Sequence, residues 1–363
     1  MSQGPRDTSS LVLLTGYDAT TINRFTTADG ISYGQIVANM NAALTTLNAE
    51  LANDSLFSSL VSYTDQPTVE YRVGTSNGFD DFTEWGRADS ARAATEGHTI
   101  PLLKKDRRLG WSWSYLKDAR LAQIQADFAD ALYDARSLWR KAILKRLLQR
   151  GDDTVGSGYS PGFATAAAST SVDFVPPSYN GTDFTSAHEH YVGISGGVFT
   201  TAVFSDAYDE LREHGHGEMG SLEFLIGPSD RATVEGLTGF VPVADPLIEY
   251  GTTESVARGA MADGYIGSIN HFRVREVRGI PQYYGVAYAS YGPNSQRNPL
   301  RVRLERGITA PRIVLMTDPT AGTANNPLQS LMLYVELGVG VSDRTGATPR
   351  YVNSATWADG TAS

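Results

Sequence analysis

One serine lies in the pattern that hydrolases use for a nucleophile, at Gly193-Ile-Ser195-Gly-Gly197. The nucleophile elbow of such enzymes requires a buried strand before the serine and a helix after it. Only Tyr191-Val192 precedes this serine, and Gly-Gly followed by a β-like VFTTAVF segment comes after it. The pattern therefore favours a glycine turn, and a serine hydrolase that uses Ser195 is the remaining alternative.

Four histidines form two closely spaced pairs, His188 with His190 and His214 with His216. Histidine nitrogens bind zinc, and an i, i+2 spacing places both side chains of a pair on one side of a strand. Both pairs lie in polar, turn-like sequence that has neither an HExxH motif nor a cysteine. We predict no metal and no cofactor, with a zinc site at these histidines as the alternative.

Paired carboxylates at Asp80-Asp81 and Asp152-Asp153 have the residue types of acid–base catalysis. Both pairs lie in glycine-flanked loops, where solvated turn residues are the usual outcome. The sequence contains no phosphate-binding glycine loop and no EF-hand pattern. These observations predict a protein that is not an enzyme.

Charge and composition exclude further classes of protein. The chain has 363 residues, a formal net charge of −10, no cysteine and a hydrophobic share of 41%. The acidic balance argues against a dedicated nucleic-acid binder, which usually carries a basic one. No run approaches the roughly 18 apolar residues of a membrane span, and the first residues lack a secretion-signal pattern. We therefore expect substantial cores and no membrane partner.

The longest regular pattern covers residues 109–150. Alternation through Trp111, Trp113 and Tyr115 predicts a strand. From Tyr115 onward no Gly or Pro occurs before Gly151, so a single helix of about 54 Å is expected at roughly 1.5 Å per residue. Its apolar stripe recurs at steps of three and four: Leu121, Ile124, Phe128, Ala131, Ala135, Leu138 and Ala142.

Before this pattern, a polar arm leads into an amphipathic helix predicted from Tyr33 to about Asp54. A strand at Val69–Val73, a polar tip, and return strands at Ile100–Leu103 and Leu109–Trp113 predict a long two-stranded ribbon. An isolated ribbon is marginal in water. It therefore requires support from another chain or surface.

After the long helix the chain is rich in turns up to Tyr191, and a mixed region of strands and helices follows. Helices are predicted at Ser205–Glu213 and from Pro228. The predicted strands are Leu222–Ile226, Phe272–Val277, Gln282–Tyr291, Arg301–Glu305, Arg312–Thr317 and Leu331–Val341. This mixture predicts an α+β or α/β domain.

The order of these parts resembles the HK97-like major capsid proteins of tailed bacteriophages. Several short stretches carry the resemblance when they are taken in sequence order. They are Phe82-Thr-Glu-Trp85, IPLLKKDRRLGWSWSYLKDA with Ser114, Leu116 and Asp118 at the head of the helix, LLQRGDD followed by GSGYSPGF, Phe224–Asp230, and Ile266–Arg275 followed by GIPQYY. The likeness covers roughly residues 30–352.

The resemblance implies an HK97-like capsid fold with an N-terminal arm, an extended β-ribbon loop (E-loop), a long spine helix in a peripheral P-domain and an inserted α/β axial A-domain. The expected divisions follow the chain. They are 1–57 for the arm and first helix, 58–110 for the extended loop, 111–190 for the peripheral domain with the spine helix, 191–310 for the axial domain, and 311–363 for the return to the peripheral domain and the tail.

The implied function is a major capsid protein that self-assembles into hexamers and pentamers of an icosahedral shell around double-stranded DNA. An encapsulin-like protein compartment is the alternative within the same fold. Subunits are expected to touch one another through Phe79, Phe82 and Trp85 of the ribbon tip and through Arg136 and Arg140 of the helix.

Some relatives crosslink their subunits through a lysine on the extended loop, but no lysine occurs between Thr64 and Thr99. We therefore expect a non-covalent shell, with a decoration protein as a possible partner. The short stretch before the first helix implies a separate scaffolding protein, which Met1 favours over a segment already removed. A portal protein and weak, non-specific contacts with packaged DNA complete the implied partners. The implied location is the virion, after assembly in the host cytoplasm.

Overall fold

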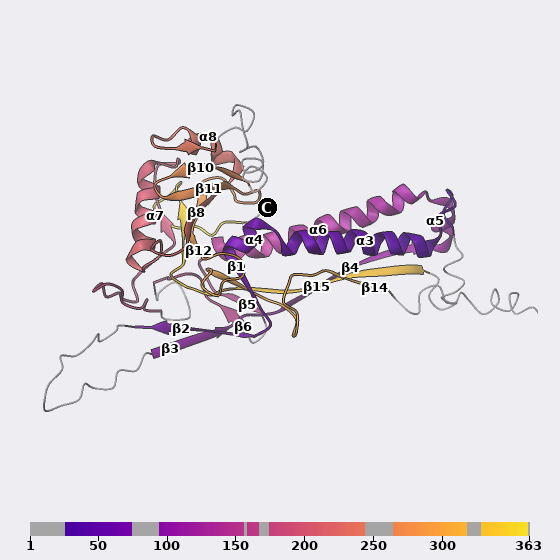
Figure 1. The fold of residues 1–363 in the computed structure, drawn as a ribbon, viewed down its shortest axis with the longest axis horizontal. Coiled ribbons are helices and arrows are strands. Elements are labelled where there is room, and N and C mark those ends of the chain that lie inside the picture. Colours follow the sequence, from indigo (N-terminus) through magenta and orange to yellow (C-terminus); the bar gives the residue numbers. More distant parts are fainter. Residues whose placement is uncertain are drawn as a thin grey trace, which may run out of the picture. The chain divides into compact units, whose positions relative to one another are not determined.

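The computed structural model describes residues 26–74, 94–155, 158–166, 174–243, 264–317 and 328–361 (Figure 1). The chain forms two compact units. Unit 1 contains residues 1–53, 103–139 and 310–336, and unit 2 contains residues 54–102, 140–309 and 337–363. The predicted α+β class is confirmed. In the described part of the chain, no helix has the length and apolarity needed to cross a membrane.

The first helix of unit 1 is α3, Tyr33–Ala52, as the sequence predicts. It begins at Ser32, whose side-chain oxygen accepts a hydrogen bond from the Gln35 N–H at 3.3 Å. Its buried face consists of residues at steps of three and four: Tyr33, Ile36, Met40, Leu44, Leu47 and Leu51. Asn48 joins this helix to the chain before β14, because its side chain both donates to and accepts from the Ile313 backbone.

The expected single helix from Tyr115 to Arg150 is wrong. The chain instead forms β4 (Leu103–Ser112), a short helix α5 (Trp113–Asp118) and the long helix α6 (Leu121–Leu148). Trp113 and Tyr115 are therefore helical, since the Ser112 side chain caps α5 by accepting from the Tyr115 N–H at 3.1 Å. With 28 residues, α6 is about 42 Å long.

The interruption between α5 and α6 has its cause far away in the sequence. The Asp29 carboxylate accepts from the Leu121 N–H at 3.1 Å, and the Ala28 N–H donates to the Ala119 carbonyl at 3.0 Å. These contacts hold Ala119 in an extended conformation and satisfy a donor at the start of α6. Alanine and arginine are good helix formers, so no local residue signals the break.

The buried face of α6 follows the predicted stripe only in its first half. Leu121, Leu138 and Ala142 of that stripe are half-buried, and beyond Ala135 the buried face continues instead through neighbouring residues. The fully buried members are Ile124, Phe128, Ala131, Ala135, Trp139, Ile143, Leu144, Leu147 and Leu148. Near the end of the helix, adjacent residues are buried together, as in the pairs Ile143-Leu144 and Leu147-Leu148. This part of the helix is therefore buried over a wider arc, as expected for a core helix.

Arg146 lies among those buried positions and is only 1% exposed. One terminal nitrogen of its guanidinium donates to the Ser160 carbonyl at 2.8 Å. The other donates to the carbonyls of Gln149 and Gly151, the latter at 2.9 Å. Arg146 therefore satisfies backbone acceptors at the C-terminal end of α6 and in the turn that follows.

The main sheet of unit 2 has seven strands in the order β7-β16-β12-β8-β11-β10-β9. The strand bounds are β7 Val192–Gly193, β8 Ser221–Ile226, β9 Val241–Pro242, β10 Tyr265–Ile269, β11 Phe272–Glu276, β12 Tyr284–Ser290 and β16 Ala347–Tyr351. The pairs β8–β11 and β7–β16 are parallel and the other pairs are antiparallel. These positions confirm the predicted strands at 222–226, 272–277 and 282–291.

Helix α7 (Thr201–Glu213) packs on this sheet through its apolar side. The rings of Phe204 and Phe224 are 4.4 Å apart between centroids, and Phe272 lies 5.7 Å from Phe224. The helix begins four residues before its predicted start. The β-like interpretation of VFTTAVF is therefore wrong, because its last four residues are helical and pack Val203 and Phe204 into this core.

The proline-led turn η2 (Pro228–Asp230) opens α8 (Arg231–Glu235), as predicted. A second sheet contains β1 (Val61–Thr64), which follows α4 (Ser55–Leu60) and pairs in parallel with β13 (Leu300–Arg303). In turn, β13 pairs with residues 338–341 of β15 (Leu328–Val341). In unit 1, β14 (Val314–Thr317) pairs with residues 331–334 of the same strand, and β4 also pairs with β15.

The ribbon is made by β2 (Thr68–Val73) and β3 (Ala94–Thr99), with Thr68 opposite Thr99 and Val73 opposite Ala94. The expected return at Ile100–Leu103 is wrong, because the chain leaves the ladder at Pro101, which has no N–H to donate. Residues 109–112 of the predicted strand 109–113 are part of β4, which pairs with β15 instead of β2, and Trp113 is the first residue of α5. The ribbon continues into β6 (Gly158–Ser160) and β5 (Asp153–Val155), in the order β2-β3-β6-β5.

We predict that Arg146→Lys lowers the free energy of unfolding by about 2–4 kcal/mol, since one ammonium cannot replace a fork that serves three carbonyls. Urea denaturation of the purified chain measures this difference. Lys141→Arg, at an exposed position of the same helix, is the matched control and should change stability by less than about 0.5 kcal/mol. Equal stabilities of Arg146→Lys and the parent would contradict the role given to the guanidinium.

Candidate functional site

The base of the ribbon is anchored in unit 2. Val69 of β2 and His98 of β3 are opposite each other, and they are 1% and 4% exposed. At the end of β3, Thr99 pairs with Tyr159 of β6. The ribbon therefore leaves the body of its own unit from a buried pair of residues.

A set of stacked side chains supports the next rungs on one face. The Tyr71 ring lies edge-on to Phe174 with centroids 5.4 Å apart, and the Arg344 guanidinium lies 4.2 Å from the Phe174 ring centroid. Arg344 is itself buried and donates to the Gly162 carbonyl at 3.1 Å. These contacts involve one face of β2 and end near Gly74, whose N–H donates to the Val175 carbonyl.

The other face of the ribbon is exposed. Glu70 and Arg72 on β2 and Thr95 on β3, which is opposite Arg72, all lie on the surface of unit 2. The three aromatic residues expected to contact a neighbouring subunit, Phe79, Phe82 and Trp85, lie outside the described residues. The described part of the ribbon therefore has a buried base and one exposed face, and it leads into the segment that contains these three aromatic residues.

The two arginines expected at a subunit contact occupy different environments. Arg136 on α6 is exposed, and its guanidinium lies 3.5 Å from the Glu50 carboxylate on α3, within unit 1. Arg140, one turn further on, is half-buried. Exposed pairs of this kind contribute little to stability. Arg136 is therefore available for contacts beyond its own chain, and Arg140 is less so.

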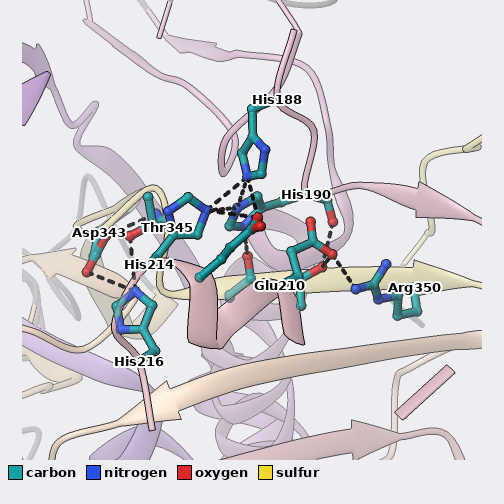
Figure 2. Close-up of polar contacts among 11 residues, drawn as sticks. His188, His190, Glu210, His214, His216, Asp343, Thr345 and Arg350 are labelled. Carbon is teal, nitrogen blue, oxygen red and sulfur yellow. Dashed lines mark hydrogen bonds and ion pairs between the residues drawn. The ribbon is translucent and has the colours of Figure 1, made fainter. Parts of the chain in front are cut away.

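Three of the four paired histidines meet in unit 2 (Figure 2). The Nε2 atom of His214 lies 2.9 Å from that of His188 and 3.0 Å from that of His190. The Nε2 atoms of His188 and His190 are 3.0 Å apart. We call these three residues the histidine cluster. His188 and His190 come from the loop before β7, and His214 follows directly after α7.

The histidine cluster is largely removed from solvent. The His190 residue is fully buried, and the side chains of His214 and His188 are 2% and 17% exposed. Burial lowers the pKa of His188, lowers that of His190 well below its ordinary value, and lowers that of His214 to about 2. All three rings are therefore neutral at physiological pH, with lone pairs on ring nitrogens.

A backbone carbonyl, an aromatic ring and a carboxylate surround the three histidine rings. The His190 Nδ1 atom lies 2.8 Å from the Ala347 carbonyl, so Nδ1 carries the proton and Nε2 is left as a lone pair. The ring of Phe184 lies 5.0 Å from that of His188 and 4.3 Å from that of His214. Glu213 Oε1 lies 3.4 Å from the Nε2 atom of His188 and 3.7 Å from that of His214.

The fourth paired histidine, His216, turns away to a separate polar group (Figure 2). Its Nδ1 atom lies 2.7 Å from the Tyr291 hydroxyl and its Nε2 atom 3.0 Å from the Thr345 hydroxyl. The i, i+2 spacing thus brings one histidine pair together and separates the other. Sequence reasoning identified the residue types, but it had no signal for the fold that joins His214 to the first pair.

Ser195 lies in an exposed turn between β7 and α7. Gly196 and Gly197 have φ values of 140° and 73°, which glycine adopts without steric cost. The glycine turn predicted for this motif is what the structure contains.

Buried charges form a further group that the sequence did not reveal. Arg350 and Glu210 form an ion pair below the histidine cluster, and the Thr348 hydroxyl also contacts Glu210 (Figure 2). Glu223 accepts hydrogen bonds from the hydroxyls of Tyr265 and Tyr288. Charged residues in strands usually face solvent, so only the three-dimensional structure identifies Glu223 and Arg350 as core positions.

Comparisons with known proteins point to one kind of fold. No model of a known protein family matches the sequence, and no curated protein matches it either. Among solved structures, a chain from Mycobacterium phage Patience is similar at 17% identity and a TM-score of 0.64, covering 99% of this chain and 97% of that one.

Two further solved structures are also similar to this chain. A chain of the bacteriophage PhiM1 mature capsid has 12% identity and a TM-score of 0.50, covering 82% of this chain and 86% of that one. A chain of the capsid of a native GTA particle has 16% identity and a TM-score of 0.50, covering 83% and 90%. The protein therefore has the HK97-like fold of phage capsid subunits, which confirms the fold that the sequence resemblance implied.

The buried His98 at the base of the ribbon should make the stability of the fold depend on pH. Burial, with the nearby charges of Arg344, Arg146 and Arg301, lowers the pKa of His98 from 6.5 to about 3. Between these values the unfolded chain binds a proton at His98 that the folded chain does not, so this residue costs stability as the pH falls. We expect His98→Leu to lose less stability than the parent between about pH 6.5 and about pH 4.

Urea denaturation at several pH values measures this difference. Tyr71→Phe, which alters the adjacent ring but keeps the imidazole, is the matched control and should follow the parent. If His98→Leu has the same pH slope as the parent, the buried neutral state of His98 is not what makes the ribbon base sensitive to acid.

Proposed function

We propose that this chain is a major capsid protein that assembles into hexamers and pentamers of an icosahedral shell around double-stranded DNA. The observation that carries the proposal is the likeness, over more than four fifths of the chain, to solved structures that include a bacteriophage capsid and the capsid of a GTA particle. Such a subunit needs large surfaces for its own copies and requires no catalytic pocket. We accordingly propose no enzymatic activity and a location in the virion, after assembly in the host cytoplasm.

The ribbon supports this proposal through its physical needs. Its base is buried in unit 2, whereas Glu70, Arg72 and Thr95 leave one face exposed. Two strands without a covering layer are only marginally stable. A neighbouring subunit is the natural source of that layer in a shell, and Phe79, Phe82 and Trp85 supply the apolar side chains for such a contact.

The acidic balance supports a container that does not hold its contents tightly. Phosphate contacts dominate DNA affinity, and a chain with a net charge of −10 offers few of them overall. We propose weak, non-specific contact with packaged DNA. The partners of such a shell are a separate scaffolding protein and a portal protein, with a decoration protein as an external stabiliser in place of the absent lysine crosslink.

An encapsulin-like compartment shares the fold and differs in what it encloses. The direct test is to express the chain alone and with a candidate scaffolding protein, and to image the purified material by electron microscopy. We expect capsomers or closed shells. A monodisperse monomer under both conditions would contradict the proposal, and shells loaded with a specific protein cargo would favour the encapsulin-like alternative.

We predict that replacing residues 74–93 with Asn-Gly leaves a folded subunit and prevents shell formation. Asn-Gly closes a two-residue hairpin between Val73 and Ala94, which are already opposite each other. Folding should persist because the buried base at Val69 and His98 is unchanged. Circular dichroism measures folding, and sedimentation with electron microscopy measures assembly.

A second variant separates the length of the ribbon from its aromatic side chains. Phe79→Ser, Phe82→Ser and Trp85→Ser together keep the length of the segment and remove its apolar side chains. We expect this triple variant to assemble as poorly as the shortened one. Normal shells from either variant, or unfolding of the subunit, would contradict the role proposed for the ribbon.

A further inference from the structure

We propose that the histidine cluster of His188, His190 and His214 is a binding site for a divalent transition-metal ion, with Zn²⁺ as the best match. The site is independent of the proposed shell function, because its ligands come from one chain and one compact unit. The inference follows from the contacts among the three Nε2 atoms, which lie 2.9–3.0 Å from one another.

Three imidazole nitrogens in mutual contact cannot all be hydrogen-bonded to one another. Each nitrogen presents either one N–H or one lone pair. A contact is favourable only when one partner donates and the other accepts, and a triangle cannot satisfy this condition at all three sides. At least one side must place two lone pairs or two protons against each other. A cation that binds all three lone pairs removes this conflict.

The size of the triangle suits a zinc ion. An ion about 1.1 Å above the plane of the three nitrogens lies about 2.05 Å from each of them, which is a normal Zn–N bond length. The Glu213 carboxylate is the nearest candidate for a fourth ligand. Its Oε1 atom lies 3.4 Å and 3.7 Å from two of the nitrogens, close to the separation of about 3.3 Å between ligands of tetrahedral zinc.

The surroundings have the features of a prepared site. The Ala347 carbonyl fixes the tautomer of His190, which leaves Nε2 free to bind a metal, as backbone carbonyls commonly do for metal-binding histidines. Burial keeps the rings neutral, the form that a metal requires. Imidazole ligands favour zinc, copper and nickel over calcium or magnesium, which prefer oxygen.

A metal at this point would join three parts of unit 2 that are distant in sequence. His188 and His190 belong to the loop before β7, His214 to the end of α7, and the Ala347 carbonyl to the first residue of β16. The loop contains little regular structure of its own. The expected role is therefore structural, and bound metal should raise the melting temperature of the chain.

The test uses the full-length chain without a histidine tag, stripped with EDTA and titrated with Zn²⁺ by calorimetry. We expect one Zn²⁺ per chain, a higher melting temperature with zinc than without, and tetrahedral Co²⁺ absorption bands after cobalt substitution. His188→Ala and His214→Ala should each weaken zinc binding by about 100-fold or more, because loss of supporting groups alone costs 10–100-fold. The exposed His271→Ala is the matched control and should bind as the parent does.

Circular dichroism of each metal-free variant distinguishes a lost ligand from a lost fold. His188 is the most informative position, since its side chain is partly exposed and its removal leaves the buried His190 in place. The proposal is overturned if the stripped chain binds no zinc, or if a folded His188→Ala and a folded His214→Ala both bind it as tightly as the parent. Neither result depends on whether the chain assembles, so failure here leaves the shell proposal untouched.

Discussion

Unit 2 depends on the buried guanidinium of Arg146. It serves the open carbonyls after α6 and, through the Ser160 carbonyl, holds β6 against the end of that helix. Since β6 pairs with β3, the same side chain links the long helix to the ribbon. A guanidinium can do this because its planar fork donates in several fixed directions, whereas an apolar side chain would leave the carbonyls unsatisfied.

The same solution recurs at two other buried segments of unit 2. Arg344 donates to the Gly162 carbonyl and Arg303 to the Ile100 carbonyl, both in stretches that lack a strand partner. Side chains thus replace the ladders that regular elements provide. The ribbon is the exception, because its outer face has no such partner among the described residues. This contrast is the physical reason for assigning that face to a neighbouring subunit.

Local periodicity in the sequence predicted most of the helices and strands, but it did not predict the residues at which they begin and end. The stripe of α3 and the apolar strand β8 are visible in the sequence, but the break before α6 depends on Asp29, some ninety residues away. Likewise, the sequence offered two histidine pairs and turn-like surroundings. Only the packing of the loop before β7 against the end of α7 joins His214 to His188 and His190. Contacts between distant segments leave no local pattern to recognise.

We infer that the chain holds the base of its ribbon and that neighbouring subunits hold the rest. Hydrogen exchange, compared between the free subunit and the assembled particle, tests this most directly. We predict slow exchange near Val69 and His98 in both states. Residues 72–74 and 94–96 should exchange rapidly in the free subunit and slowly in the particle. Equal protection of these outer residues in both states would contradict this inference.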